Sequence, residues 1–367
     1  MINLQKYYQK NKNTLKVKGD KIKVGFTVGD MNGIGPEVLL KSLSDYMLLE
    51  LITPVIYGPI NNLVFTANHF DLDMSFNKIK NAGSSDPEKV NVINEFNVVP
   101  EISFGELDKE MGELAFSSIE KAVIDLNKNQ IDVLVTAPIN KEAIHSEKFN
   151  FMGHTDYIDS KVEGEAVMMM VSEGLRVALL TEHMPISKVS ESITRELVDR
   201  KIKALNHTLK RDFQIERPKI AVLSIDPHGG DNGVIGSDDK KILNPAIKDL
   251  YESGILVFGP YASDSFFGSS EFKKFDLVVA SFHDQGLIPF KTLSFGKGVN
   301  YTSGLSKIRT SPDHGTAFGI SGKNTAMKES FLSSIFLAID LFKNRKTYDK
   351  LIENSLVSKK QLKSNEK

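Results

Sequence analysis

The sequence predicts an α/β protein built on a mainly parallel, doubly wound sheet. Short runs rich in β-branched residues alternate along the chain with longer segments of helical periodicity, which is the pattern of repeated βα units. The chain has 367 residues, and 41% of them are hydrophobic, which is enough for two α/β domains that face each other across a cleft. Because ligands of such sheets bind beyond the carboxyl ends of the strands, the segments that follow strands are the expected functional regions.

Eight short segments have the composition of buried strands, with Val, Ile and Leu bounded by turn-forming residues. We expect strands at Ile22–Val28, Thr53–Tyr57, Val90–Phe96, Val133–Thr136, Val167–Val171, Arg176–Leu180, Ile220–Ile225 and Leu277–Ser281. Five longer segments repeat apolar residues at helical spacing. We expect helices at Pro36–Glu50, Lys109–Asn127, Arg195–Asp212, Asp238–Glu252 and Met327–Phe342.

The bulk composition excludes several classes of function. The 46 Lys and Arg residues balance 47 Asp and Glu residues, so no overall field attracts nucleic acid or an anionic membrane. The chain has no cysteine, which excludes disulfides, thiolate metal sites and a cysteine nucleophile. Residues 1–20 and 357–367 are polar tails without an apolar signal segment, and no run reaches the roughly 18 apolar residues of a membrane span. We therefore expect a cytoplasmic protein.

Three histidines share one setting, because His183, His228 and His283 each follow a predicted strand. Imidazole is a preferred ligand of zinc and similar divalent ions, and three protein ligands with one open position are typical of a catalytic metal site. The alternative is that each is a hydrogen-bonded loop histidine. The helix-spaced His-Glu-x-x-His signature is absent, so the spacing alone does not bring the three together.

Several polar residues stand at predicted loop-to-helix junctions, where backbone amides and the helix dipole favour anions. They are Lys291, Arg309 and the pair His154-Thr155. The alternative is that Lys291 and Arg309 are surface charges and that Thr155 only caps a helix.

A glycine-containing loop, Gly29–Glu37, follows the first predicted strand and leads into a helix that has Pro36 near its start. It has the character of a binding loop, but its glycines do not form the G-x-G-x-x-G pattern. The chain also lacks a P-loop and a G-x-S-x-G elbow. A Rossmann dehydrogenase, a P-loop NTPase and an α/β-hydrolase are thus disfavoured.

Seven motifs in this order resemble the 4-hydroxythreonine-4-phosphate dehydrogenase family of pyridoxal phosphate biosynthesis, over about Lys21 to Leu341. They are Gly29–Glu37, Thr136–Lys141, Gly153–Asp156, Val167–Met170, Asp226–Asp231, His283–Gly286 and Arg309–Ala317. The chain departs from the commonest form of these motifs at Asp30-Met31-Asn32, at Asp226 and around His183, and keeps every matched ligand.

The resemblance implies a fold of two α/β/α domains with a cleft, similar to isocitrate and isopropylmalate dehydrogenases, which bind NAD without the Rossmann fingerprint. We expect residues 21–130 and about 300–350 to form the first domain. Residues 131–299 are expected to form the second, which carries the histidines and the dimer interface. The resemblance also implies a homodimer whose active site is shared across the interface, with one histidine from the partner.

The resemblance assigns roles to individual residues. It implies that His183, His228 and His283 bind a divalent metal (zinc, cobalt or magnesium) and that the substrate is contacted by His154, Thr155, Lys291, Asn300 and Arg309. We expect Lys291 to act in catalysis as well, and Asp284 to orient an imidazole or relay a proton. The alternative for Asp284 is a solvent-facing or capping role.

The implied reaction is the NAD-dependent oxidation of 4-phosphooxy-L-threonine at its C3 alcohol. Its product, 2-amino-3-oxo-4-phosphooxybutanoate, then loses CO₂ to give 3-amino-2-oxopropyl phosphate. Three alternatives remain open: a related dehydrogenase of 4-phospho-threonate or another hydroxy acid, a phosphate acyltransferase, and a non-catalytic ligand-binding protein.

Overall fold

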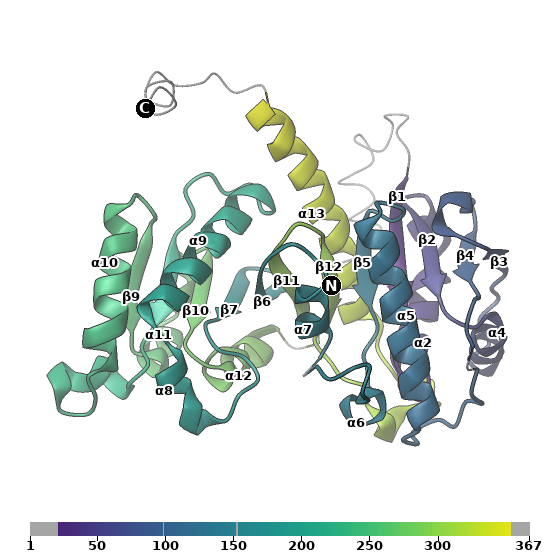
Figure 1. Ribbon diagram of the computed structural model, residues 1–367, viewed down its shortest axis with the longest axis horizontal. Coiled ribbons are helices and arrows are strands. Elements are labelled where there is room, and N and C mark those ends of the chain that lie inside the picture. The colour runs from purple at the N-terminus through teal and green to yellow at the C-terminus, as the bar shows by residue number, and fades with distance from the viewer. Residues whose placement is uncertain (1–20, 98, 152, 295, 354–367) are drawn as a thin grey trace.

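In the part of the chain that the structure describes, a single sheet of twelve strands carries helices on both faces (Figure 1). The computed structural model describes residues 21–97, 99–151, 153–294 and 296–353. The strands are β1 Ile22–Thr27, β2 Ile52–Tyr57, β3 Phe76–Ile79, β4 Val90–Ile93, β5 Val133–Thr136, β6 Gly164–Ser172, β7 Leu175–Leu179, β8 Ile220–Leu223, β9 Val257–Tyr261, β10 Leu277–Ala280, β11 Val299–Leu305 and β12 Arg309–Pro312. Their order in the sheet is β3-β4-β2-β1-β5-β12-β11-β6-β7-β10-β8-β9.

The sheet consists of two parallel halves joined by an antiparallel centre. The strands from β3 to β12 pair in parallel, and so do β7, β10, β8 and β9. Between them, β12–β11, β11–β6 and β6–β7 are antiparallel pairs. The predicted parallel, doubly wound architecture is confirmed in each half, whereas the antiparallel centre was not predicted.

The helices cover the two faces of the sheet unequally. They are α2 Gly35–Leu43, α3 Tyr46–Leu49, α4 Ile60–His69, α5 Lys109–Asn127, α6 Lys141–Ile144, α7 His154–Asp159, α8 Val189–Ser192, α9 Arg195–Arg211, α10 Asn244–Glu252, α11 Ser263–Gly268, α12 His283–Ser294 and α13 Glu329–Glu353. On one face, side chains of α2, α13, α9 and α10 join one continuous core that spans both halves. On the other face, one core contains α5 and a separate core contains α11 and α12. The functional pocket described below lies on this divided face.

All eight expected strands are present, and the expected helix Lys109–Asn127 coincides with α5. The expected helix Pro36–Glu50 is wrong as a single element, because it is divided into α2 and α3. The break occurs at Asp45, whose extended backbone and side chain cap a new helix by accepting a 3.1 Å hydrogen bond from the Met47 amide. Helix α13 continues past the expected end at Phe342 to Glu353.

The domain division remains a prediction, but strand pairing corrects one of its details. Strand β5 pairs with β1 and β12 and therefore belongs to the same half of the sheet as β1. The sequence analysis had assigned its residues, which follow residue 130, to the second domain. The predicted polar tails, residues 1–20 and 357–367, lie outside the described residues. Within the described ranges, no helix combines the length and apolar composition needed to cross a bilayer. The cytoplasmic location remains a prediction.

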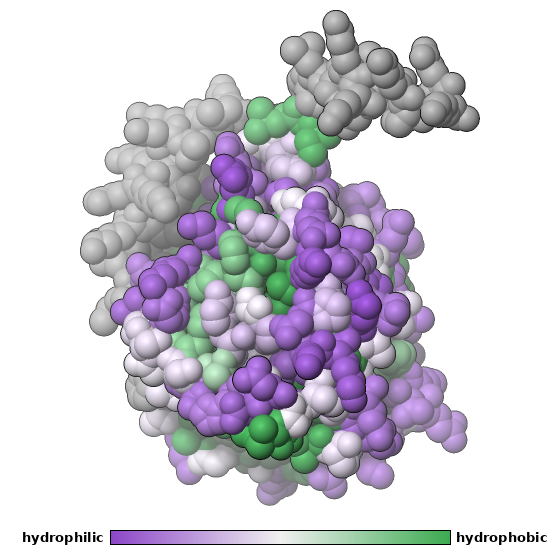
Figure 2. All heavy atoms as spheres, turned by 90° about the vertical axis from the view of Figure 1, so that its left-hand side faces the viewer, coloured by the Kyte–Doolittle hydropathy of each residue, from purple (hydrophilic) through white to green (hydrophobic). Residues whose placement is uncertain are grey.

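The end of the molecule formed by β9 and its neighbouring helices has a mainly hydrophilic surface, with apolar side chains in small groups (Figure 2). Exposed apolar residues of this half include Val234, Ile235 and Tyr251.

Candidate active site

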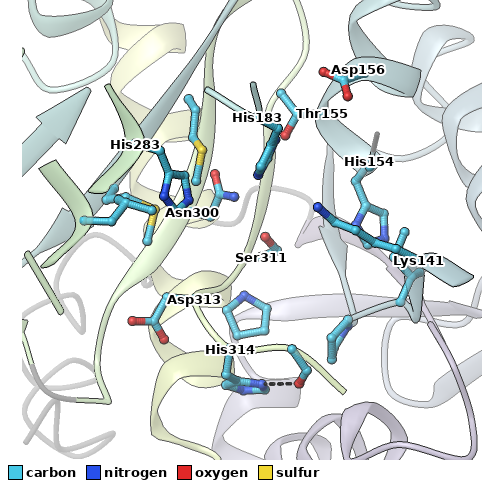
Figure 3. Close-up of a pocket in the computed structure, with 18 of the residues that line it drawn as sticks. Lys141, His154, Thr155, Asp156, His183, His283, Asn300, Ser311, Asp313 and His314 are labelled. Carbon is cyan, nitrogen blue, oxygen red and sulfur yellow. Dashed lines mark hydrogen bonds between the residues drawn. The ribbon is translucent and has the colours of Figure 1, made fainter. Parts of the chain in front are cut away.

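A pocket of about 260 Å³ lies at the antiparallel centre of the sheet, between the two separate cores of the divided face. Its wall contains residues of α6, α7, β6, β11, β12 and α12, together with the segment after β7. Side chains from these elements converge on one space in Figure 3. The pocket therefore contains residues that are far apart in the sequence, at a junction between two halves of an α/β sheet.

Two of the three predicted metal ligands, His183 and His283, meet in this pocket. His183 follows β7, and His283 is the first residue of α12, directly after β10. Because β7 and β10 are neighbouring parallel strands, their ends bring the two ring centres to 5.6 Å from each other. Burial lowers the pKa of His183, and the nearby charges of Lys141 and His283 lower it further. The neutral imidazole, with a free lone pair, is thus favoured, which is the form that binds metals.

Asp284 contacts the neighbouring imidazole. Its Oδ1 lies 2.7 Å from Nδ1 of His283. If Nδ1–H donates this hydrogen bond, Nε2 carries the lone pair, as a metal-binding histidine requires. The contact is the one that the predicted orienting role needs, whereas proton relay by Asp284 remains a prediction.

Arg309 is the most buried charged group of the pocket, with 2% of its surface exposed. It lies on β12 and not at the predicted loop-to-helix junction, which corrects that part of the sequence analysis. Its Nε and Nη2 donate to the Thr136 hydroxyl at 3.1 and 2.6 Å, and Nη1 donates to the Thr302 hydroxyl at 3.2 Å. No carboxylate of the described residues lies within ion-pair distance of the guanidinium. Burial lowers the pKa of Arg309, because the charged form is desolvated without a counterion.

His154 and Thr155 line the pocket at the start of α7, as the sequence analysis predicted. Nε2 of His154 is buried and has no hydrogen-bond partner within the described part of the chain. Burial, followed by the charges of Arg309 and Lys141, holds the pKa of His154 well below its usual range. A neutral ring with an unsatisfied nitrogen is therefore available to a ligand.

The two other predicted substrate contacts also line the pocket. Asn300 lies on β11, and its buried Oδ1 has no partner among the described residues. Lys291 is exposed in the last turn of α12 and belongs to the pocket wall. The five predicted substrate-binding residues thus meet in one space.

Comparisons with known proteins identify the family of this chain. The family described as pyridoxal phosphate biosynthetic protein PdxA matches residues 50–338. The chain belongs to the PdxA family. It is 43% identical over 328 residues to the 4-hydroxythreonine-4-phosphate dehydrogenase of Bacteroides thetaiotaomicron, which covers 89% of this chain and 90% of that protein.

Two further relatives of the PdxA family extend the comparison. The D-threonate 4-phosphate dehydrogenase of Cupriavidus necator is 37% identical over 333 residues, covering 88% of this chain and 98% of the relative. The solved structure of the 4-hydroxythreonine-4-phosphate dehydrogenase from Klebsiella pneumoniae superimposes with a TM-score of 0.75 at 31% identity. That match covers 89% of this chain and 99% of the other.

His228 does not join the other two histidines of this PdxA-family chain. It lies in the exposed segment Pro227–Gly233, and it is absent from the wall of the pocket. From His228 to Asn232 the backbone is left-handed, with φ of 54° at His228, and the carboxylates of Asp226 and Asp239 bind backbone amides at the base of the segment. In the described part of one chain, no three potential metal ligands come together.

The donor set of one chain therefore fits a metal ion only in part. His183 and His283 offer two nitrogens on one wall of the pocket, and a catalytic site of this kind needs a third ligand. Within the described part of one chain, the pocket thus holds two of the three predicted metal ligands, and the shared site that the family resemblance implies remains a prediction.

The sequence analysis gave no role to several residues of the pocket wall. They are Lys141, Asp156, Ser311, Asp313 and His314. All five fall inside the motifs that carried the family resemblance, so the motifs contained the signal. What was missing was the strand pairing that brings the motifs together.

Proposed function

We propose that this protein is a NAD-dependent dehydrogenase that oxidises 4-phosphooxy-L-threonine at its C3 alcohol. Membership of the PdxA family supports this reaction class. In the pocket, the buried guanidinium of Arg309 is the observation that supports a phosphorylated substrate. A buried guanidinium without a carboxylate partner is costly unless a ligand supplies the anion. Its planar fork of donors suits the oxygens of a phosphate.

The phosphate end of the substrate is expected beside Arg309 and Lys291. Arg309 is held rigidly by the Thr136 and Thr302 hydroxyls, so its unused donors are oriented before the ligand arrives. Lys291 adds a second positive charge at the exposed rim. His154 and Asn300 each have a buried polar atom without a partner, and both atoms could bond to the substrate's polar groups.

The reacting end is expected beside the two histidines. A divalent metal ion held by His183 and His283, with His228 of the partner subunit as third ligand, would supply Lewis acidity that lowers the pKa of the alcohol. Asp284 lies 2.7 Å from Nδ1 of His283, which would leave Nε2 to the metal ion, and burial lowers the pKa of His183 toward the neutral, metal-binding form. These two contacts support the proposal that both imidazoles bind one ion.

The proposed chemistry has two balanced steps. The C3 hydroxyl loses its proton and C3 loses a hydride to NAD, so that C3 becomes a ketone. The C1–C2 bond of the resulting 3-oxo acid then breaks, CO₂ leaves, and the electron pair that remains at C2 accepts a proton to give 3-amino-2-oxopropyl phosphate. This product belongs to pyridoxal phosphate biosynthesis, the process for which the family is named.

A second candidate substrate is D-threonate 4-phosphate, because the 37%-identical relative carries that name. It has the phosphate, carboxylate and C3 alcohol of the first candidate and differs at C2, where a hydroxyl replaces the amine. The phosphate-binding features of the pocket suit both compounds.

The test is a substrate panel followed by the absorbance of the reduced coenzyme. The purified protein, supplied in turn with zinc, cobalt or magnesium, is offered each compound with NAD or NADP. We expect 4-phosphooxy-L-threonine with NAD to give the highest kcat/KM. A higher value with D-threonate 4-phosphate would replace the substrate, and no reduction of either coenzyme with either compound would refute the proposal.

A further inference from the structure

Lys141 is a third cation of the pocket, besides Arg309 and Lys291, and the proposed function assigns it no task. It is the first residue of α6, where the Asn140 side chain caps the helix by accepting from the amides of Glu142 and Ala143 at 2.9 and 3.1 Å. Gly112 of α5 permits close packing at this point, because a Cβ there would lie 2.1 Å from the Ala143 carbonyl oxygen. The backbone that carries Lys141 is therefore fixed against a long helix.

The ammonium group of Lys141 points into the pocket, into the space between His154 and His183 (Figure 3). No hydrogen bond or ion pair with another described residue is seen for this group. Its charge lowers the pKa of both histidines, after the larger effect of burial. Lys141 is thus a free positive charge close to both the proposed substrate-binding and metal-binding residues.

The two carboxylates in the wall of the pocket, Asp156 and Asp313, do not form ion pairs with Lys141. Asp156 lies near the edge of the view in Figure 3, and its carboxylate forms no ion pair with Lys141 in the described part of the chain. Asp313 accepts a 3.1 Å hydrogen bond from the Ser330 hydroxyl. An anion that enters the pocket can therefore meet Lys141 as well as the pair Arg309 and Lys291.

We propose that Lys141 binds the carboxylate of the substrate, while Arg309 binds its phosphate. This inference rests on the proposed function, which requires a substrate with both anionic groups. It makes Lys141 a specificity-determining residue, which selects phosphorylated acids over phosphorylated alcohols.

The different burial of the two cations supports this assignment. The phosphate stays on the substrate throughout the reaction, whereas the carboxylate leaves as CO₂. The cation that binds the carboxylate must therefore remain in the pocket without an anion after CO₂ has left. An exposed ammonium such as Lys141 can be hydrated at that point, but a guanidinium as buried as Arg309 cannot.

The test compares two ligands that differ only in the carboxylate. We would measure the binding of 3-phosphoglycerate and of glycerol 3-phosphate by calorimetry to the wild-type protein, Lys141→Met and Lys141→Arg. Lys148→Met is the matched control, because it removes the same charge from an exposed position outside the pocket. We expect Lys141→Met to lower the affinity for 3-phosphoglycerate about tenfold and the affinity for glycerol 3-phosphate by less than about twofold.

The remaining variants complete the test. We expect Lys141→Arg to keep most of the preference for the acid, and Lys148→Met to leave both affinities unchanged. Equal weakening of the two ligands by Lys141→Met, or no weakening of either, overturns the carboxylate assignment while leaving the proposed function intact. If neither ligand binds the wild-type protein, the phosphate assignment of the proposed function fails, and the role of Lys141 fails with it.

Discussion

The ring centres of His183 and His283 lie 5.6 Å apart, with the ring planes inclined by 44°. The two residues follow neighbouring strands whose register is fixed by the pairs Val278–Val177 and Ala280–Leu179. The paired strands therefore bring both residues to one edge of the sheet, where His183 lies in the segment after β7 and His283 begins α12. Paired strand ends of this kind bring the two histidines together before a ligand binds.

Asp284→Asn should weaken metal binding without unfolding the protein. The charged acceptor of His283 Nδ1–H is lost, and a change of this kind typically costs about tenfold to a hundredfold in metal affinity. Asp284 is 72% exposed, so the fold should tolerate the change. Zinc affinity measured by competition with a chelator tests the prediction, with the unfolding transition as a check on the fold.

The matched control is Asp264→Asn, an exposed acidic residue in the first turn of α11. It should leave zinc affinity unchanged. If Asp284→Asn binds zinc as tightly as the wild-type protein, the Asp284–His283 contact has no orienting role, and the solvent-facing alternative for Asp284 holds.

Replacement of Arg309 should separate ligand binding from stability. Arg309→Met removes a buried cation that has no carboxylate partner within the described part of the chain, so the free energy of unfolding should stay the same or rise. The KM for the phosphorylated substrate should increase by about tenfold to a hundredfold, because charge-assisted hydrogen bonds to the phosphate are lost. Steady-state kinetics and urea unfolding measure the two effects.

Arg345→Met is the contrasting control, because Arg345 is also buried but is paired with a carboxylate. It donates to Asp212 at 2.6 Å, and its loss leaves that carboxylate buried and unpaired. We expect a loss of about 3–5 kcal/mol of stability. Comparable destabilisation by Arg309→Met would show that Arg309 serves the fold and not a ligand.

Asp30 should make stability depend on pH. The side chain is fully buried in the loop before α2, and Oδ1 accepts from the Asn32 amide at 3.0 Å, whereas Oδ2 has no partner among the described residues. Burial, with a further contribution from the charge of Asp108, raises the pKa of Asp30 from 3.8 to about 6. The folded protein thus binds the proton more tightly than the unfolded chain, so stability falls as the pH rises from about 4 to about 6.

Asp30→Asn removes this pH dependence. The loss at neutral pH corresponds to at most about 3 kcal/mol, so the variant should be more stable than the wild type by about 1–3 kcal/mol at pH 7. The difference should disappear below about pH 4, where the wild-type side chain is neutral in both states. Urea unfolding across this pH range measures it, and a difference that does not vary with pH would contradict the titration of Asp30.

The sequence predicted the elements of this fold better than their arrangement. The strands before His183 and His283 are continuous apolar runs, which identified both residues as following strand ends. Strand β12, Arg309–Pro312, is as buried but has a polar sequence, so periodicity could not distinguish it from a loop. Its pairing with β5 joins residues more than a hundred positions apart, such as Arg309 and Leu134, which local patterns do not encode.

The same reason explains which site residues were found. Of the substrate contacts, Asn300 came from the family resemblance alone, whereas His154 and Arg309 had first been singled out at predicted loop-to-helix junctions. The pocket that joins them depends on the antiparallel centre of the sheet. Lys141 belongs to a motif that was recognised but not interpreted, because only the tertiary structure places its ammonium beside His183. The separation of His228 from the other two histidines likewise has no signal in the sequence.

The position of His228 leads to the most direct test of a shared active site. His228→Ala and His283→Ala homodimers should each be inactive, because each lacks one proposed metal ligand in both sites. In a heterodimer of the two variants, one site would combine intact His183 and His283 with the intact His228 of the partner subunit, and the other site would lack two ligands. Heterodimers isolated with two different affinity tags should therefore have about half of the wild-type activity.

A heterodimer of His183→Ala and His283→Ala is the matched control. These two histidines meet within one chain, so each site of this heterodimer lacks one of them and should stay inactive. Activity in the first heterodimer and none in the second would establish that His228 acts across the interface. Inactivity of the first heterodimer, with both chains folded and dimeric, would instead require all three histidines to come from one chain, after a movement of the Pro227–Gly233 segment toward the pocket.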